Sequence, residues 1–277
     1  MIKHQFSFYL LWVLLGCLLS VNALSDDGFP GRIQYPSVKI LTKEQLYSRL
    51  KNDKAVVVDV RSNYEYNTLK ILNAVNIPVS SKNFPDKLKQ LRASTNKAIV
   101  FYCNGRTCYK SYNAGIKAIK YNVKNCFSYD AGVFEWAQSY PDKAELLGKS
   151  PVNKEHIITK DKFTKRLLSP EEFEQKVLMD NTLVYDVRDR EQRRGGSGLF
   201  VFRDKSVDLD NTKKLKRIVA KAIGNDSTLL FYDQKGKQVR WLQYFLEQQG
   251  LKKYYFMKGG AGAYYDMLKK QQLNSSL

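Results

Sequence analysis

The sequence predicts an α/β protein with two domains, each built on a parallel sheet flanked by helices. Short β-branched runs alternate with helical patterns along the chain, and strands that are separated by helices form parallel sheets. A weak internal repeat divides the chain into two similar halves. The length of 277 residues is sufficient for two domains of ordinary size.

The internal repeat consists of three pairs of segments that occur in the same order. The pairs are "AVVVDVRSNYEY" (55–66) with "TLVYDVRDREQR" (182–193), "AIVFYCNG" (98–105) with "TLLFYDQK" (228–235), and "FSYDAGVFEW" (127–136) with "YFMKGGAGAYY" (255–265). Their offsets lie between 127 and 130 residues. We therefore expect a first domain over 38–148, a polar linker over 149–165 and a second domain over 166–273.

The first domain begins with a predicted helix and continues with three strands. Thr42 is the expected N-cap of this helix, and Leu46 and Leu50 share one face of it at a spacing of four residues. Continuous apolar runs are typical of strands that are buried on both faces of a sheet. Such runs lie at 55–60 and 98–103, and a third strand is expected over 125–132.

A second helix is predicted over 109–122, between the second and third strands. Its expected inner face holds Ala114, Ala118 and Ile119. Two Gly-rich stretches, 193–198 and 259–263, do not follow a strand in the way that a phosphate-binding loop would. We interpret both as turns.

The N-terminal segment 1–23 has the features of a secretory signal peptide. A short region with Lys3 precedes an apolar run at 6–21, and small residues end at Ala23. The chain is therefore expected in the periplasm or outside the cell. An uncleaved membrane anchor and a lipoprotein attached through Cys17 are less favoured alternatives.

The chain is strongly basic, with a formal charge of +19. The Lys and Arg residues are spread along the sequence, which is typical of a solvated surface. Because an exported protein rarely meets nucleic acid, we expect no nucleic-acid partner. A small anionic substrate or an anionic membrane surface remains compatible with this charge.

Cysteine usage points to a reactive thiol rather than to a disulfide scaffold. Three cysteines remain after removal of the signal peptide, namely Cys103, Cys108 and Cys126. Cys103 ends a predicted strand at the carboxyl edge of the sheet, where α/β proteins place their sites. Asn104, Gly105, Arg106 and Thr107 form a permissive loop, and a helix is predicted to start near Cys108.

Both the loop and the helix start favour an anion at Cys103. Backbone N–H groups can turn toward the sulfur, and a helix N-terminus lowers the pKa of a nearby thiol. Arg106 adds a positive charge. We therefore expect a depressed pKa for Cys103 and a site for a small anion around it.

The remaining residues exclude several classes of cysteine chemistry. His4 and His156 lie in the signal peptide and the linker, so a Cys–His protease has no suitable base. The spacing of the Cys and His residues does not suit a metal site, and no cofactor motif follows a strand. A Cys-based phosphatase would need arginine where Tyr109 stands. Sulfur transfer fits, because a thiolate can take a sulfane sulfur while the leaving group departs as an anion.

These motifs resemble the rhodanese family of sulfurtransferases. The matching segments are "DVRSNYEY" (59–66), "LNAVNIP" (72–78), "FYCNGRTCYKS" (101–111) and "YDAGVFEW" (129–136). The resemblance implies a parallel sheet with flanking helices, a catalytic Cys103 that carries a persulfide, and a substrate-binding loop formed by Asn104, Gly105, Arg106, Thr107 and Cys108. It implies an anionic sulfur donor and a thiol or cyanide acceptor.

The sequence departs from the family pattern at three places. Lys70 stands where the family often has His, and Ala131-Gly132 replaces a Gly-Gly pair. The second copy has Asp233 at the position of Cys103. A carboxylate cannot accept a sulfane sulfur, so we expect the loop amides of that copy to hold the Asp233 side chain itself. The second domain would then cover the first or bind another protein.

The roles of the remaining candidates stay open between alternatives. Asp59 and Arg61 are expected to form a supporting ion pair, since Asp186 and Arg188 repeat it in the copy without the cysteine. A contact of this pair with the loop or substrate is the alternative. Cys108 is either a helix-start residue or a resolving thiol, and Cys126 is expected in the core.

The predicted function is sulfane-sulfur transfer from thiosulfate, or a related donor, through Cys103. One alternative is a binding module of the same fold in which Cys103 has no chemical role. Another is a thiol redox protein that uses Cys103 and Cys108.

Overall fold

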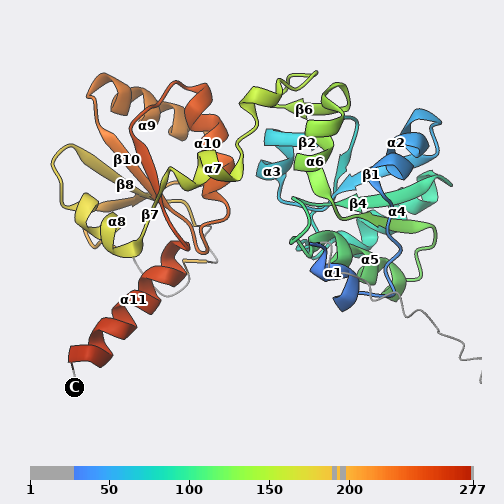
Figure 1. The fold of residues 1–277 in the computed structure, drawn as a ribbon, viewed down its shortest axis with the longest axis horizontal. Coiled ribbons are helices and arrows are strands. Elements are labelled where there is room, and N and C mark those ends of the chain that lie inside the picture. The colour runs from blue at the N-terminus through green and yellow to red at the C-terminus, as the bar shows by residue number, and fades with distance from the viewer. Residues whose placement is uncertain (1–27, 189–191, 194–197, 276–277) are drawn as a thin grey trace, which may run out of the picture.

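The computed structural model describes residues 28–188, 192–193 and 198–275, and it shows two α/β units joined by a short connection (Figure 1). The first sheet has the strand order β3-β1-β4-β5, and all of its pairs are parallel. Its strands are β1 (Ala55–Asp59), β3 (Val75–Asn76), β4 (Ala98–Tyr102) and β5 (Cys126–Tyr129). Its helices are α1 (Pro30–Gln34), α2 (Lys43–Lys51), α3 (Asn63–Thr68), α4 (Phe84–Ser94), α5 (Lys110–Lys120) and α6 (Gly132–Ser139).

A small antiparallel pair beside this sheet was not predicted. It joins β2 (Leu69–Ile71) to β6 (Ala144–Leu146), and a 3₁₀ turn at Pro141–Lys143 precedes β6. Its strands span three residues each, too few to show a clear alternation in the sequence.

The strand β4 carries alternate side chains to opposite faces of the first sheet. Val100 and Tyr102 pack with α2 and α6, whereas Phe101 and Cys103 pack with α4 and α5. Because side chains in a strand alternate with a period of two, the residue that follows Tyr102 must point to the α5 side. The Cys103 side chain therefore lies in the layer between the first sheet and α5.

The second sheet has the order β7-β11-β10-β8-β9, again with parallel pairs. Its strands are β7 (Leu167–Leu168), β8 (Thr182–Asp186), β9 (Asp204–Ser206), β10 (Thr228–Tyr232) and β11 (Tyr254–Met257). Its helices are α8 (Pro170–Val177), α9 (Thr212–Gly224), α10 (Val239–Gln248) and α11 (Gly260–Ser275). Helices α9 and α10 cover one face, and α8 and α11 cover the other (Figure 1).

The two sheets have corresponding strand orders. Strands β3, β1, β4 and β5 match β9, β8, β10 and β11, and the extra β7 matches a single bridge between Ile40 and Ser128. The register agrees as well, since Ala55 pairs with Ala98 and Thr182 with Thr228. The predicted fold class, with parallel sheets flanked by helices, is confirmed.

The connection between the two units is folded and partly buried. It contains a 3₁₀ turn at Lys154–His156 and the helix α7 (Lys160–Thr164). Ile157 and Ile158 are buried, and the Ile158 amide donates to the Tyr244 hydroxyl at 2.9 Å. The polar linker predicted from composition therefore also holds apolar residues that pack against α10.

Three local predictions were wrong. Ile119 is 55% exposed, because Ala114, Gly115 and Ala118 fill the inner face of α5. Cys126 is half-buried at the first residue of β5 rather than in the core. Part of the stretch 259–263 forms the first turn of α11 rather than a turn alone.

The predicted signal peptide lies outside the described residues, as does most of the Gly-rich stretch 193–198. Within the part of the chain that the structure describes, no helix is long and apolar enough to span a bilayer.

Candidate functional site

The candidate site is the loop that joins β4 to α5. It begins at Cys103, directly after the last residue of β4, and α5 starts at Lys110, one residue after the start of the predicted range 109–122. Within it the Cys108 amide donates to the Gly105 carbonyl at 2.8 Å. The Val133 amide donates to the Cys103 carbonyl at 3.0 Å, so the first turn of α6 holds the start of the loop.

Gly132 allows α6 to approach this loop closely. Its φ is +77°, and a Cβ built there would overlap the backbone nitrogen and Cα of Gly105. A side chain at this position would therefore both strain the backbone and displace the loop. Gly132 was noted in the sequence as half of a motif, and the structure supplies the physical reason for glycine.

Cys103 is fully buried, and its thiol is held in the protonated form. Burial raises its pKa, contacts with Cys108 raise it further, and Ser111 opposes them. The Cys103 Sγ lies 3.1 Å from the Cys108 carbonyl oxygen and 3.6 Å from the Ser111 hydroxyl. The expectation of a depressed Cys103 pKa is wrong for this loop conformation, because burial and the contacts with Cys108 outweigh the hydrogen bonds from Ser111.

The depressed pKa belongs to Cys108, which is half-buried. A hydrogen bond with the Cys103 thiol lowers the pKa of Cys108 and burial opposes it. The backbone amides of Asn104 and Lys110 lower it further, to about 6. Backbone amides were expected around Cys103 but act on Cys108 instead. Of the two thiols, Cys108 is therefore the one that ionises first.

Asp59 and Arg61 form a buried ion pair that also reaches the loop. Arg61 Nη2 lies 2.5 Å from Asp59 Oδ2, and both side chains are fully buried. Arg61 Nη1 donates to Asn104 Oδ1 at 3.1 Å, and Nη2 donates to the Leu69 carbonyl at 2.6 Å. Both readings of this pair are therefore present in the geometry, a structural ion pair and a contact with the loop.

Glu65 connects the other side of Asn104 to the start of α5. Its Oε1 accepts from Asn104 Nδ2 and its Oε2 from Lys110 Nζ, each at 3.0 Å. Burial alone would raise the pKa of the Glu65 carboxyl, but Lys110 and Arg61 outweigh burial, and the pKa lies below its usual range. The Asn104 amide is thus fixed by a cation on one side and an anion on the other.

Arg106 and Thr107 lie at the exposed rim of the loop. Arg106 Nη2 is 3.0 Å from Glu135 Oε2, and its guanidinium carbon is 4.7 Å from the centre of the Phe29 ring. The Arg106 side chain is 50% exposed. In this conformation Arg106 contacts α6 and the N-terminal segment.

The equivalent loop of the second copy closes around a carboxylate. Asp233 Oδ1 accepts from the amides of Lys235, at 2.8 Å, and Gly236, and Oδ2 accepts from those of Gln238 and Val239, the latter at 3.0 Å. Asp233 is buried. The prediction that this copy fills its own anion cradle is confirmed.

The second unit also contacts the support of the first loop. Trp241, on α10, is buried against the first unit and stacks on Phe134 with 5.2 Å between ring centres. The Arg61 guanidinium carbon lies 4.9 Å from the centre of the Trp241 ring. One side chain, Arg61, therefore links the second unit to Asn104.

Sequence reasoning did not assign four residues that the structure brings to this site. Glu65, Lys110 and Ser111 lie within quoted motifs, and their closeness in sequence to Arg61 and Cys103 was an available signal. Trp241 lies 138 positions beyond Cys103, and no local pattern places it near Arg61.

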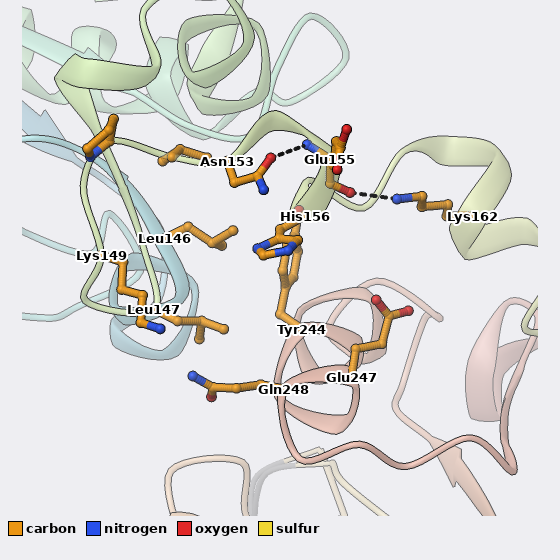
Figure 2. Close-up of a pocket in the computed structure, with 12 residues that line it drawn as sticks. Leu146, Leu147, Lys149, Asn153, Glu155, His156, Lys162, Tyr244, Glu247 and Gln248 are labelled. Carbon is orange, nitrogen blue, oxygen red and sulfur yellow. Dashed lines mark hydrogen bonds between the residues drawn. The ribbon is translucent and has the colours of Figure 1, made fainter.

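A separate cavity of about 490 Å³ lies between the connection and α10 (Figure 2). Figure 2 labels His156 and Tyr244 among the residues that line this cavity, and Glu247 projects from α10. Lys149 and Lys162 also line it. None of the described residues that line this cavity belongs to the Cys103 loop. Among the described residues, no group of three or more His, Cys, Asp and Glu side chains could hold a metal ion.

Comparisons with known proteins agree with the fold of the first unit. Residues 42–139 match the family model of the Rhodanese-like domain. The tRNA uridine(34) hydroxylase of Yersinia enterocolitica is 25% identical over 158 residues, which cover 54% of this chain and 43% of that protein. The chain thus spans less than half the length of the curated relatives that it matches.

Solved structures with a similar arrangement include sulfurtransferases. The thiosulfate sulfurtransferase from Pseudomonas aeruginosa has a TM-score of 0.36 and 17% identity, covering 85% of this chain and 46% of that one. A human single-domain sulfurtransferase has a TM-score of 0.31 and 25% identity, covering 36% of this chain and 96% of that one. The match at 42–139 gives the first unit a rhodanese-like fold.

Proposed function

We propose that the chain is a sulfurtransferase that moves a sulfane sulfur from thiosulfate, or a related anionic donor, to a thiol or to cyanide. One observation carries the proposal: Cys103 directly follows β4 in a unit that matches the rhodanese-like domain, and the equivalent loop of the second copy turns four amides onto an anion. A loop of this design can hold a sulfur anion on Cys103.

The reaction needs a thiolate and a leaving group, and no general base beyond the loop. Once the loop has turned its amides onto Cys103, this thiol loses its proton to the neighbouring Cys108 thiolate, and the Cys103 sulfur attacks the outer sulfur of thiosulfate. The S–S bond of thiosulfate breaks and sulfite leaves with the electron pair. Cys103 then holds a persulfide, which an acceptor thiol or cyanide removes.

The anion on Cys103 requires the loop to turn its amides inward. The amides of Gly105, Arg106, Cys108 and Tyr109 stand at the positions of the four amides that bind Asp233. In the present conformation the Cys108 carbonyl faces Cys103 instead. Turning the Cys108 peptide would exchange this acceptor for donors and stabilise the persulfide anion.

The second unit has no role in the chemical step of this proposal. We assign it a rhodanese-like fold on the correspondence of its strands and loop with those of the first unit. Its α10 covers Arg61 through Trp241, and its other surfaces remain available to a protein partner. The proposal places the protein in the periplasm or outside the cell, on the N-terminal sequence alone.

Thiosulfate-dependent formation of thiocyanate by the full chain tests this function. Cys103→Ser should abolish turnover, and Cys126→Ser should retain it as the matched control. Turnover by Cys103→Ser would overturn the assignment. No turnover and no change in mass would favour a binding module, and a loss of about 2 Da on mild oxidation without sulfur transfer would favour a thiol redox protein.

A further inference from the structure

We propose that Cys108 is a second sulfur-carrying thiol, which takes the sulfane sulfur from Cys103 and presents it to thiol acceptors. This inference deepens the proposed function and rests on it. It assigns a chemical role to a residue of the loop that was otherwise a helix-start position or a resolving thiol.

The difference in exposure of the two sulfurs is the first reason for a relay. Cys103 is fully buried between β4 and α5. Cys108 is half-buried and directly follows the exposed residues Arg106 and Thr107. A small anion can reach a buried sulfur through a modest movement of the loop. A peptide or protein thiol carries a backbone with it and needs a sulfur nearer the surface.

The contact between the two residues is the second reason. Cys103 Sγ donates to the Cys108 carbonyl at 3.1 Å, and the Cys103 side chain lowers the pKa of the Cys108 thiol. No other side chain of the loop has both a nucleophilic atom and this contact. The amides of Asn104 and Lys110, together with the Lys110 charge, stabilise an anion on the Cys108 sulfur.

The transfer step balances without an oxidant or a reductant. After thiosulfate has reacted, Cys103 carries –S–S⁻ and Cys108 holds the proton that it received. This proton passes to the outer sulfur of the persulfide, and the Cys108 thiolate forms a bond to the same sulfur. The S–S bond to Cys103 breaks, and Cys103 keeps the electron pair as a thiolate. Cys108 then carries –S–SH, which an acceptor thiol attacks.

The sequence makes the position of the sulfur directly measurable. Trypsin cleaves after Lys97, Arg106 and Lys110, so Cys103 lies in the peptide 98–106 and Cys108 in the peptide 107–110. Cys126 lies in a third peptide, 125–143, and serves as an internal control. Each cysteine can therefore be assigned its own mass.

The test treats the full chain with thiosulfate, alkylates it rapidly with iodoacetamide and maps these peptides without reductant. We expect an added sulfur of about 32 Da on both 98–106 and 107–110 in the wild type, and on neither in Cys103→Ser. Added sulfur on 98–106 alone would overturn the relay and leave the proposed function intact. Added sulfur on 107–110 in Cys103→Ser would overturn the proposed function as well.

Turnover of Cys108→Ser with two acceptors provides a second readout. Because Cys108 also takes the proton of Cys103, both rates should fall in this variant, but transfer to a cysteine-containing peptide should fall by about 10-fold more than transfer to cyanide. An equal fall with both acceptors would overturn the relay. A cross-link between 98–106 and 107–110 with release of sulfide would also overturn it, because Cys108 would then resolve the persulfide rather than carry it.

Discussion

The loop after β4 and the loop after β10 occupy equivalent positions, each between a central strand and the following helix, but they stabilise charge at different atoms. In the second loop, four backbone amides converge on the carboxylate of Asp233, the residue that directly follows the strand. In the first loop, the residue that follows the strand is Cys103, and a carbonyl lies beside its sulfur. The lowered pKa belongs to Cys108, five residues later.

This difference shows what a permanent anion does to such a loop. A carboxylate is ionised at neutral pH and can hold its amides inward at all times. A buried thiol is neutral, so its loop is free to place a carbonyl against it and to turn when an anion forms. The second loop, with its amides on the Asp233 carboxylate, thus shows the conformation that the first loop should adopt when an anion forms on Cys103.

Moving the cysteine from the first loop to the second is expected to have the largest effect. In the full chain, Cys103→Ser combined with Asp233→Cys should give no thiocyanate from thiosulfate and cyanide. A cysteine at 233 would be buried and would lack the Asn-Gly-Arg-Thr sequence and the second thiol of the first loop. Turnover above that of Cys103→Ser alone would show that a cysteine directly after the central strand is sufficient for activity, whatever the sequence of the loop.

Gly132→Ala should break the first loop while the rest of the fold persists. The new Cβ would overlap Gly105, and a displacement of about 1 Å can lower turnover by roughly 100-fold. Gly148→Ala is the matched control, because its φ of +78° is nearly the same and no heavy atom lies within 4 Å of the built Cβ. Equal losses in the two variants would assign the effect to backbone strain alone.

The ion pairs of the two copies allow stability to be separated from function. Arg61→Met and Arg188→Met each leave a buried aspartate unpaired, at a cost of about 3–5 kcal/mol in the free energy of unfolding. Only the first change also removes the hydrogen bond to Asn104. Urea unfolding should show similar losses, and turnover at low temperature should fall in Arg61→Met alone. Equal turnover would separate Arg61 from the site.

The pH dependence of alkylation should distinguish the two thiols. The Cys103 hydrogen bond and the loop amides lower the pKa of Cys108 to about 6, so its thiolate dominates above that pH. Burial raises the pKa of Cys103, so it stays protonated through neutral pH. Modification of 107–110 by iodoacetamide should therefore rise through about pH 6 and then level off. Faster modification of 98–106 at pH 7 would reverse the assignment.

Arg106→Ala is expected to have the smallest effect. The side chain is half exposed and paired with Glu135, and an exposed ion pair is worth about 1 kcal/mol or less. KM for thiosulfate should rise by no more than about 5-fold. A rise of about 30-fold or more, measured with cyanide in excess, would show that Arg106 leaves Glu135 to bind the donor.

The strands, the repeat and the Cys103 loop could be predicted because each follows from a local pattern. Continuous β-branched runs identify buried strands, and Asp233 at the cysteine position indicated a self-filled cradle. Burial of Cys103 and the orientation of the Cys108 peptide could not be read in this way, since they depend on how α5 and α6 pack over the loop. The Trp241–Arg61 contact depends on the docking of α10, which no repeat or periodicity encodes.

In the proposed reaction the first loop accepts the sulfur through Cys103. The most direct measurement is the intact mass of the full chain after incubation with thiosulfate and removal of the excess. We expect a gain of about 32 Da in the wild type and in Cys126→Ser, and no gain in Cys103→Ser. A gain of the same size in Cys103→Ser, or none in the wild type, would contradict it.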